Sequence, residues 1–301
     1  MIDRLIGAAG SIKRHKSYFL LTIFAPVLIL FIIIRVLPIF LTLLFAFTNY
    51  TFTKPVIEFR GLMQIQKLIT DPTVHRAFFN SFEFVLISVP AVVVLGFLFA
   101  YLVNQAVELS GPFETLYFLP YIIPLVPAAI IWTWIYAPGE TGILNSMLGR
   151  VGLSYVPWLT RPRLTVISII VMFIWKRLGY YIIIFLVGLK NIDPNLKDAA
   201  LVDGASTWQR VARIEIPVMR PIILYATIFG TIVAMAVFTE VYIMTAGTDT
   251  VGGTELYVVA TKIYTEAFLY MKIAYASSIS LALFVVSFIL VFVQFKLLQS
   301  R

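Results

Sequence analysis

The chain has 301 residues, of which 60% are hydrophobic and only 13% are charged. Soluble domains are roughly 45–50% apolar and about 25% charged, so this chain has too few charged residues to cover a surface in water, and its composition predicts an integral membrane protein. The formal net charge of +8 indicates basic residues beside membrane spans rather than a nucleic-acid site, because no basic cluster alternates with aromatic residues outside the apolar runs.

The residue types that carry much of enzyme chemistry are scarce. The absence of cysteine excludes disulfides, thiolate metal sites and a cysteine nucleophile. The two histidines, His15 and His75, stand apart, which argues against a histidine-based metal or acid/base centre. No G-x-x-x-x-G-K-S/T motif occurs, so the chain cannot hold ATP phosphates by that loop. The sequence therefore predicts a protein that is no enzyme and that binds no metal or cofactor of its own.

Six apolar stretches are long enough to cross a membrane. A bilayer core about 30 Å thick requires about 20 mostly apolar residues in a helix, and open sheet edges cannot face lipid, so these stretches are expected to be helices. They lie at about 18–47, 82–103, 116–136, 164–189, 221–245 and 274–295. The predicted fold is an all-α integral membrane protein with six transmembrane helices, in which one transmembrane domain covers residues 18–301.

The first stretch is predicted to be an uncleaved helix. Lys13, Arg14 and Lys16 precede it as in a signal peptide, but the apolar run is far longer than the 7–15 residues of a signal core, and no cleavage site follows. The segment before it, residues 1–17, is expected to be cytoplasmic or interfacial. Apolar residues at helical spacing within 2–9 favour a short interfacial helix, and a frayed terminus is the alternative.

An even number of spans places both termini on the same side of the membrane. With cytoplasmic termini, slightly more basic residues flank the inner side than the outer side, and the flank of the first span is basic. The positive-inside rule therefore favours cytoplasmic termini. The loop at 104–115, which would then lie inside, weakens this preference, since it contains Glu108 and Glu114 but no basic residue.

The polar loop at 190–221, between the fourth and fifth spans, is predicted to contain two helices. Asp193 followed by Pro194 is typical of a helix start, with an N-cap and a proline at the first helical position. Gly204 can end this helix in the left-handed conformation. Ser206 and Gln209 have the spacing of a capping box that begins a second helix. The pattern favours a rigid projection at the membrane surface.

The second helix of this loop is expected to end at Pro217 and Pro221, which lead into the fifth span. An ordinary amphipathic linker is the alternative interpretation. A flexible linker does not require two sets of helix-start residues, so the rigid projection is preferred. Such a projection suits docking into a groove on another protein.

These residues resemble the EAA loop of ABC-importer permeases. The motif consists of Asp198, Ala199, Ala200, Asp203, Gly204 and Ala205, with Ile214, Pro217 and Pro221 downstream. Other segments are similar to the sugar and glycerol-phosphate permease subgroup: FLPYIIP at 118–124, Trp132, Tyr136, GILN at 142–145, Trp175 and Lys176 with Gly179, Thr261, Tyr264, Ala267, Phe268 and YAS at 275–277. Asp198 replaces the family's Glu, and Val211 replaces its usual Phe.

The resemblance implies one permease subunit of a binding-protein-dependent type I ABC importer in the bacterial cytoplasmic (inner) membrane. The loop at 190–221 would be the cytoplasmic coupling loop that contacts the ATPase. The implied partners are a dimer of ABC ATPase subunits, a second permease that is a similar but distinct chain, an extracytoplasmic solute-binding protein and membrane lipid, with no nucleic acid. ATP and Mg²⁺ would be used by the partner ATPase.

Ionisable residues inside the spans are candidates for the substrate pathway, because each costs at least about 2.5–3.5 kcal/mol at membrane depth. They are Arg35, Glu83, Lys176, Arg177 and Glu240. With neighbouring aromatic residues, the predicted pathway set is Trp175, Lys176, Arg177, Tyr180, Tyr181, Glu240 and Tyr242. Aromatic faces beside cationic donors are typical of a site for a sugar that carries carboxylates or phosphate. Ion pairs, or contacts with a partner subunit, are the alternative roles of the two cations.

Adjacent residues of a helix point about 100° apart, so at most one of Lys176 and Arg177 can face the pathway. The other is expected to contact a partner chain or a carboxylate such as Glu240. We expect Arg177 to be the substrate contact and the substrate to be acidic. Glu240 could instead line the pathway or pair with Arg35.

The predicted function is the transport of a sugar, an oligosaccharide or a polyol phosphate delivered by a solute-binding protein. A self-sufficient secondary transporter driven by an ion gradient is the main alternative, but it would require inverted repeats and paired broken helices, and no internal repeat is evident. A membrane scaffold would not require charged residues inside its spans.

Overall fold

The computed structural model describes residues 19, 22–105, 117–246, 250–251, 254–256 and 258–299. The whole segment 1–17, with the predicted interfacial helix within 2–9, and most of the loop at 104–115 lie outside these residues. The described protein is mostly helical. A two-residue hairpin pairs β1 (Thr250–Val251) with β2 (Thr254–Glu255), with Thr250 opposite Glu255 and Val251 opposite Thr254.

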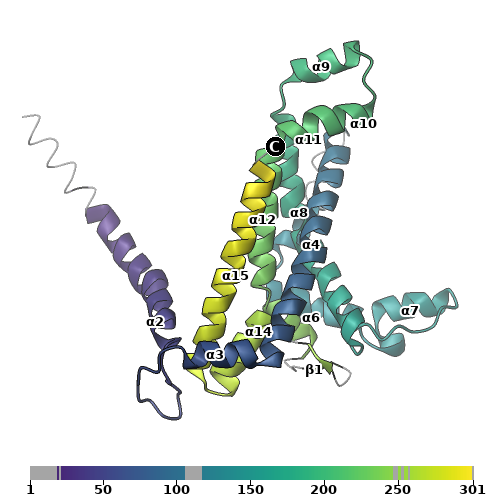
Figure 1. Ribbon diagram of the computed structural model, residues 1–301. Coiled ribbons are helices and arrows are strands. Elements are labelled where there is room, and N and C mark those ends of the chain that lie inside the picture. The colour runs from purple at the N-terminus through teal and green to yellow at the C-terminus, as the bar shows by residue number, and fades with distance from the viewer. Residues whose placement is uncertain are drawn as a thin grey trace, which may run out of the picture.

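Four helices form the centre of the molecule and run side by side (Figure 1). They are α4 (Pro72–Gln105), α8 (Pro162–Lys190), α12 (Arg220–Met235) and α15 (Ile273–Gln299). Helix α4 packs against α8 and α12, and α12 packs against α15. Phe84 of α4 meets Phe173 of α8 edge to face, with ring centroids 5.2 Å apart. Because lipid is as apolar as these side chains, close packing rather than exclusion of water holds the helices together.

Among the residues that the structure describes, four continuous helices are long and apolar enough to cross a membrane: Thr22–Phe45, Pro72–Gln105, Pro162–Lys190 and Ile273–Leu298. They coincide with the first, second, fourth and sixth predicted stretches. A fifth span arises if the helix at 207–218, which is bent by 71° against α12, is counted with it. The presence of several apolar spans is confirmed, and the number six stays a prediction.

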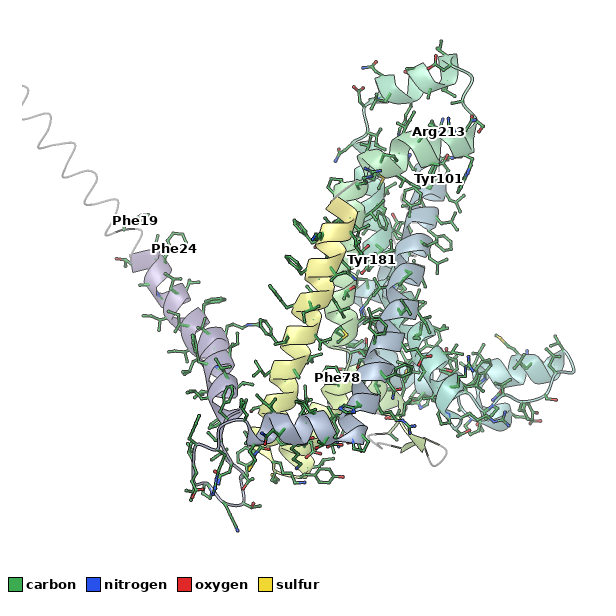
Figure 2. All side chains as sticks on the ribbon, viewed as in Figure 1. Phe19, Phe24, Phe78, Tyr101, Tyr181 and Arg213 are labelled. Carbon is green, nitrogen blue, oxygen red and sulfur yellow. The ribbon has the colours of Figure 1, made fainter. Side chains whose placement is uncertain are left out.

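The first of these helices diverges from the bundle toward its N-terminal end, whereas its last part contacts α15 (Figure 1). It contains a π-helical turn, η1 (Ile32–Val36), followed by α2 (Leu37–Phe45). None of its most apolar 18-residue window is buried. Figure 2 shows Phe19 and Phe24 at the end that is remote from the other helices. The π-turn lies directly before Pro38, whose missing N–H and ring disturb the regular hydrogen-bond ladder of the helix.

The third predicted stretch is interrupted by a proline. A helix over 117–122 ends before Pro124, which is the N-cap of α6 (Leu125–Ile135). Pro124 lacks a backbone N–H and biases Ile123 away from the helical conformation. The expectation of one unbroken helix over 116–136 is therefore wrong.

The fifth predicted stretch is also interrupted, but by residues that are not helix breakers. Helix α12 ends at Met235, and the short helix α13 (Thr239–Met244) begins after Ala236, Val237 and Phe238. The unbroken helix expected over 221–245 is wrong for this reason. A new helix, α13, therefore begins inside the apolar stretch.

Shorter elements lie at the two ends of the bundle. At the end that also contains the C-terminal end of α15 (Figure 1) are α9 (Pro194–Val202), α10 (Thr207–Arg210), η3 (Val211–Glu215) and α11 (Ile216–Val218). At the opposite end are α3 (Met63–Thr70), η2 (Gly139–Thr141), α7 (Ile143–Arg150), α14 (Val259–Tyr264) and η4 (Thr265–Leu269).

The α7 arm, residues 137–158, projects sideways from this second end (Figure 1). Its centre is the fully buried side chain of Asn145. The amide nitrogen of Asn145 donates to the carbonyls of Ala137 and Val156, at 3.1 and 3.0 Å. Its oxygen accepts from the backbone N–H of Val156 at 2.9 Å and from the indole N–H of Trp158 at 3.2 Å. One side chain therefore closes the arm on itself.

Asp71 connects α3, α4 and α15 at the same end. Its carboxylate accepts hydrogen bonds from the Tyr275 hydroxyl at 2.6 Å and from the backbone and hydroxyl of Thr73 at 2.9 and 2.7 Å. Partial burial raises the pKa of this carboxyl, but the hydrogen bonds from Tyr275 and Thr73 outweigh burial and lower the pKa. The ammonium of Lys67 lies 4.2 Å from the centre of the Tyr275 ring. These contacts hold α3 across the end of the bundle.

Candidate functional site

The loop between α8 and α12 has the two helix starts that the sequence predicts. Asp193 accepts a hydrogen bond from the backbone N–H of Asn195 at 2.9 Å, and Pro194 is the first residue of α9. Ser206 and Gln209 form a reciprocal capping box at the start of α10, with distances of 3.3 and 2.8 Å. Both predicted caps are confirmed. Each satisfies backbone N–H groups that a helix start would otherwise leave unpaired.

Gly204 forms the elbow between α9 and α10. Its φ is +72°, and a Cβ built on it meets nothing within 4 Å. Backbone conformation, rather than lack of space, therefore calls for glycine at this position. The backbone N–H of Ala205 donates to the carbonyl of Ala200 at 2.9 Å and completes the turn. The predicted left-handed glycine is confirmed.

The end of the second helix differs from the prediction. Pro217 lies inside α11, and the helix continues to Val218 before the chain bends by 71° into α12 at Met219. The π-helical turn η3 precedes Pro217 and loosens the regular hydrogen-bond ladder, so the missing N–H of that proline is tolerated. Pro221 then lies in the first turn of α12, where a proline N–H is not needed.

Polar contacts anchor the loop to the bundle. Arg210 donates to the Tyr101 hydroxyl of α4 at 3.3 Å and forms an ion pair with Glu215 at 3.2 Å. Figure 2 shows Tyr101 and Arg213 at this end of the molecule. The ammonium of Lys197 donates to the carbonyl of Leu189, the next-to-last residue of α8, at 3.2 Å. The loop is thus fixed to the helices on both sides of it.

The motif residues of the loop divide into an outer and an inner set. Ala200 is 6% exposed and packs toward its own chain. Ala205 and Pro217 are half-buried, and Asp198, Ala199, Asp203 and Gly204 are exposed. Large apolar side chains are exposed beside them, with Val202 at 89% and Trp208 at 76%. Exposed apolar groups on a rigid projection are typical of a docking surface.

Three consecutive residues of α8 contact three different neighbours. Trp175 meets Trp132 of α6 edge to face, with centroids 5.4 Å apart. The ammonium of Lys176 donates to the carbonyl of Tyr121 at 2.7 Å and lies 5.4 Å from the centre of its ring. Arg177 contacts Glu240 of α13 at 2.8 Å. The expectation that Lys176 and Arg177 point in different directions is confirmed.

Arg177 and Glu240 form a buried ion pair. Their side chains are 15% and 2% exposed, and the guanidinium also lies 3.8 Å from the centre of the Phe173 ring. Within the described residues, Arg177 Nη1 and Glu240 Oε1 have no hydrogen-bond partner, so the contact is electrostatic rather than a formed hydrogen bond. Glu240 therefore pairs with Arg177 and not with Arg35. Arg177, the expected substrate contact, already has a carboxylate partner.

The predicted pathway tyrosines have different surroundings. Tyr180 is half-buried, stacks on Tyr121 with centroids 5.3 Å apart, and shares a hydrogen bond of 2.9 Å with the Tyr225 hydroxyl. Tyr181 is 1% exposed, and its hydroxyl donates to the carbonyl of Ala226 at 3.2 Å. Figure 2 shows Tyr181 within the bundle. This position argues against Tyr181 as a pathway residue, because α12 covers it.

Tyr242 belongs to a separate aromatic cluster. Its ring stacks on Phe238 and meets Tyr264 of α14 edge to face, both with centroids 5.2 Å apart. This cluster joins α13 to α14. The structure therefore brings together Lys176, Arg177, Glu240 and Tyr180 around α8, whereas Tyr242 lies in a neighbouring group.

Three aromatic residues at this site were missed by sequence reasoning: Tyr121, Tyr225 and Phe229. Tyr180 contacts all three. Tyr121 lies in the FLPYIIP segment, which offered a signal through the resemblance, whereas Tyr225 and Phe229 lie in an ordinary apolar run and offered none. Within the described residues, no group of three or more His, Cys, Asp or Glu side chains could hold a metal ion.

Comparisons with known proteins agree with this arrangement. Residues 72–301 match the family described as binding-protein-dependent transport system inner membrane component. The lactose transport system permease protein LacF of Rhizobium radiobacter is 30% identical over 296 residues, which cover 97% of this chain and 98% of LacF. The sulfoquinovosyl glycerol transport system permease protein SmoG of Agrobacterium fabrum is 28% identical, over 92% of this chain and 89% of SmoG.

Solved structures are similar over nearly the whole chain. A chain of a bacterial ABC transporter involved in the import of the acidic polysaccharide alginate has a TM-score of 0.83 and 26% sequence identity, and the match covers 97% of this chain and 98% of that chain. A chain from the alginate transporter in complex with its periplasmic protein, bound to an alginate pentasaccharide, has a TM-score of 0.81 at 26% identity.

Proposed function

Because the chain belongs to the family of binding-protein-dependent transport system inner membrane components, we propose that it is a permease subunit of an ATP-driven ABC importer for a sugar, an oligosaccharide or a polyol phosphate. The observation that carries this function is the likeness, over nearly the whole chain, to a lactose permease and to an alginate importer. A solute-binding protein delivers the substrate, as the alginate transporter solved with its periplasmic protein indicates.

In this proposal the rigid segment 193–217 is the coupling loop and docks into a groove of an ABC ATPase on the cytoplasmic side. Its support is the pair of capped helices, the left-handed Gly204, and the exposed Asp198 and Val202 beside the elbow. A rigid helix inserted into a groove is a recurrent mode of protein recognition. ATP and Mg²⁺ are held by the ATPase dimer, and this chain supplies the contact surface.

The coupling loop acts as a lever on two spans. It follows α8 directly, and its second helix bends into α12 at Met219. The anchors from Arg210 to Tyr101 and from Lys197 to Leu189 prevent the loop from moving independently. A displacement of the loop on ATPase closure would therefore move α8 and α12 as rigid bodies, which is the motion that alternating access requires.

The topology of this proposal has six spans, with both termini in the cytoplasm of a bacterium. Within the described residues, four continuous helices and one bent pair support spans by length and composition, and the third stretch is an interrupted helical segment. The coupling loop and the C-terminal end of α15 lie at the same end of the bundle (Figure 1), as cytoplasmic termini require. In this proposal, residues 1–17 precede a transmembrane domain that covers residues 18–301. The chain pairs with a second permease that is similar but distinct.

The proposed substrate pathway lies beside α8 and α13 and is formed by Trp175, Lys176, Arg177, Tyr180 and Glu240, with Tyr242 nearby. Lys176 and Arg177 carry two positive charges against the single carboxylate of Glu240, so the group has an excess of positive charge. This excess supports an acidic sugar as substrate. Lys176 is a better candidate than Arg177 for binding an acidic group of the substrate, since its contacts within the described residues are a carbonyl and an aromatic ring.

Reconstitution tests this function directly. The permease pair, the ATPase and the binding protein would be incorporated into liposomes, and uptake of labelled glycans would be measured with and without ATP. We expect uptake only when both ATP and the binding protein are present. Uptake driven by an ion gradient alone would instead support a self-sufficient secondary transporter and would overturn the importer assignment.

A further inference from the structure

A pocket with charged and apolar walls lies between the N-terminal parts of α4 and α8. Its volume is about 550 Å³. Arg76 of α4 and Arg163 of α8 line it, together with Glu83 and the apolar side chains of Phe79, Ile87 and Ile167. None of these residues belongs to the proposed substrate pathway or to the loop at 193–217, so the pocket is considered separately.

The two arginines have no ion-pair partner within the described part of the chain. Both are exposed, and they come from different helices that pack against each other. Two guanidinium groups on one pocket repel each other, and an anion between them would turn this repulsion into attraction. The pocket also lies at the N-terminal end of α8, whose partial positive charge adds to the attraction for an anion.

The arginines lie near the starts of two apolar helices, at the level where a bilayer core about 30 Å thick would end. Helix α4 has 34 residues, whereas about 20 are enough to cross the bilayer core, so its first turns extend beyond the core. Arg163 directly precedes the apolar stretch of α8. Phosphate groups of phospholipids occupy this level, and a planar guanidinium can bind phosphate with two hydrogen bonds.

The pocket continues from these charges toward apolar surface. Ile87 lies three turns after Arg76 on the same side of α4, which places it about 16 Å deeper along the helix. Ile87 is 44% exposed, and Ile167 of α8 is 47% exposed. A free phosphate ion would use only the charged end. A phospholipid would use both ends, because its acyl chain can lie along these isoleucines.

We propose that this pocket binds an anionic phospholipid, with its phosphate between Arg76 and Arg163 and an acyl chain along Ile87 and Ile167. Glu83 lies about 10 Å below Arg76 on the same side of α4, so its negative charge confines the phosphate to the upper end. The site is independent of the transported substrate, and it would tie α4 to α8 at the end opposite the coupling loop.

Native mass spectrometry of the purified, delipidated importer complex tests this site. Phosphatidylglycerol, phosphatidylcholine or inorganic phosphate would be added, and the bound species would be counted. We expect phosphatidylglycerol to bind, and Arg76→Gln and Arg163→Gln each to weaken it about tenfold or more, because each variant loses a charge-assisted hydrogen bond. Arg76→Lys keeps the charge and should retain much of the binding, which separates loss of the site from misfolding.

Two further variants complete the test. Arg150→Gln removes an exposed arginine from the end of α7 at the same end of the molecule, and it should leave lipid binding unchanged. Glu83→Gln removes the nearby negative charge and should leave binding equal or make it tighter. The proposal is overturned if Arg150→Gln weakens binding as much as Arg76→Gln, or if Glu83→Gln weakens it. Displacement of the lipid by equimolar inorganic phosphate, or cross-linking of Phe79 to the second permease instead of lipid, would also overturn it.

Discussion

Arg177 on α8 and Glu240 on α13 approach each other to 2.8 Å inside the membrane-spanning region and are the charged link between these two helices. Glu240 can make this contact because the fifth apolar stretch breaks at 236–238 and α13 begins anew. The pair therefore joins the helix that precedes the coupling loop to a segment beyond the break in the helix that follows it. Its disruption should affect both stability and transport.

The first prediction concerns this pair. Removal of one partner of a buried ion pair costs about 3–5 kcal/mol, because the other charge remains buried and unpaired. We expect Glu240→Gln to lower the thermal stability of the purified complex markedly. The double variant Arg177→Met/Glu240→Gln should recover part of the loss. Lys176→Met, which breaks no ion pair, is the control and should have a smaller effect. Strictly additive losses in the double variant would contradict the coupling of the two charges.

The second prediction concerns the elbow of the coupling loop. Gly204→Val places a β-branched residue at a φ of +72°, and the left-handed conformation costs a residue with a Cβ roughly 1–2 kcal/mol. We expect the variant to insert in the membrane, and we expect the importer complex that contains it to hydrolyse ATP at its ATPase subunits without importing substrate. Gly152→Val is a matched control, since Gly152 has a φ of +75° and also has nothing within 4 Å of a built Cβ. Normal import by Gly204→Val, or an equal loss in Gly152→Val, would contradict the assignment.

The third prediction concerns close packing between α8 and α12. A Cβ on Gly230 would lie 2.6 Å from the Tyr181 hydroxyl oxygen and 3.1 Å from Val89, so Gly230→Ala should destabilise the protein by about 1–3 kcal/mol through overpacking. Tyr181→Phe removes the hydroxyl oxygen and should restore much of that stability in the double variant. Thermal unfolding measures both effects. A double variant no more stable than Gly230→Ala would show that the clash lies elsewhere.

The fourth prediction concerns pH. Hydrogen bonds lower the pKa of Asp71 in the folded protein. The ionised carboxylate therefore stabilises the folded state at pH values above the pKa in the unfolded chain, which is about 3.9. This stabilisation is lost as the pH falls through the lower pKa of the folded state. We expect the thermal stability of the parent to fall in that acidic range relative to its value at neutral pH. Asp71→Asn should lack this part of the pH dependence, and Tyr275→Phe should reduce it. An identical acid dependence in the parent and in Asp71→Asn would exclude this contribution.

Local signals in the sequence predicted the two helices of the loop at 190–221 best. The N-cap at Asp193, the left-handed Gly204 and the capping box of Ser206 each depend on a few adjacent residues, and all three are present. Apolar runs also predicted where the long helices lie. The break after Met235 could not be predicted in this way, because Ala236, Val237 and Phe238 are as apolar as their neighbours and include no glycine or proline.

Which side chains contact each other inside the bundle could not be predicted without the fold. The sequence showed that Lys176 and Arg177 cannot share a direction, but which cation meets Glu240 depends on how α13 sits against α8. The surroundings of Tyr181 also could not be predicted from the sequence. It follows Tyr180 directly, so its side chain points in another direction, into the core, where its hydroxyl donates to the carbonyl of Ala226. Adjacent tyrosines with the same chemistry therefore have different surroundings.

The four hydrogen bonds of Asn145 join Ala137, Val156 and Trp158, at the two ends of the α7 arm. Gly152 lies in the exposed turn after α7, and a Cβ built on it meets nothing within 4 Å. A short epitope inserted after Gly152 should therefore be accepted without loss of import. An antibody applied to intact spheroplasts would then show on which side of the membrane the arm lies. The arm that Asn145 holds together is therefore a suitable place to determine the topology of the chain in cells.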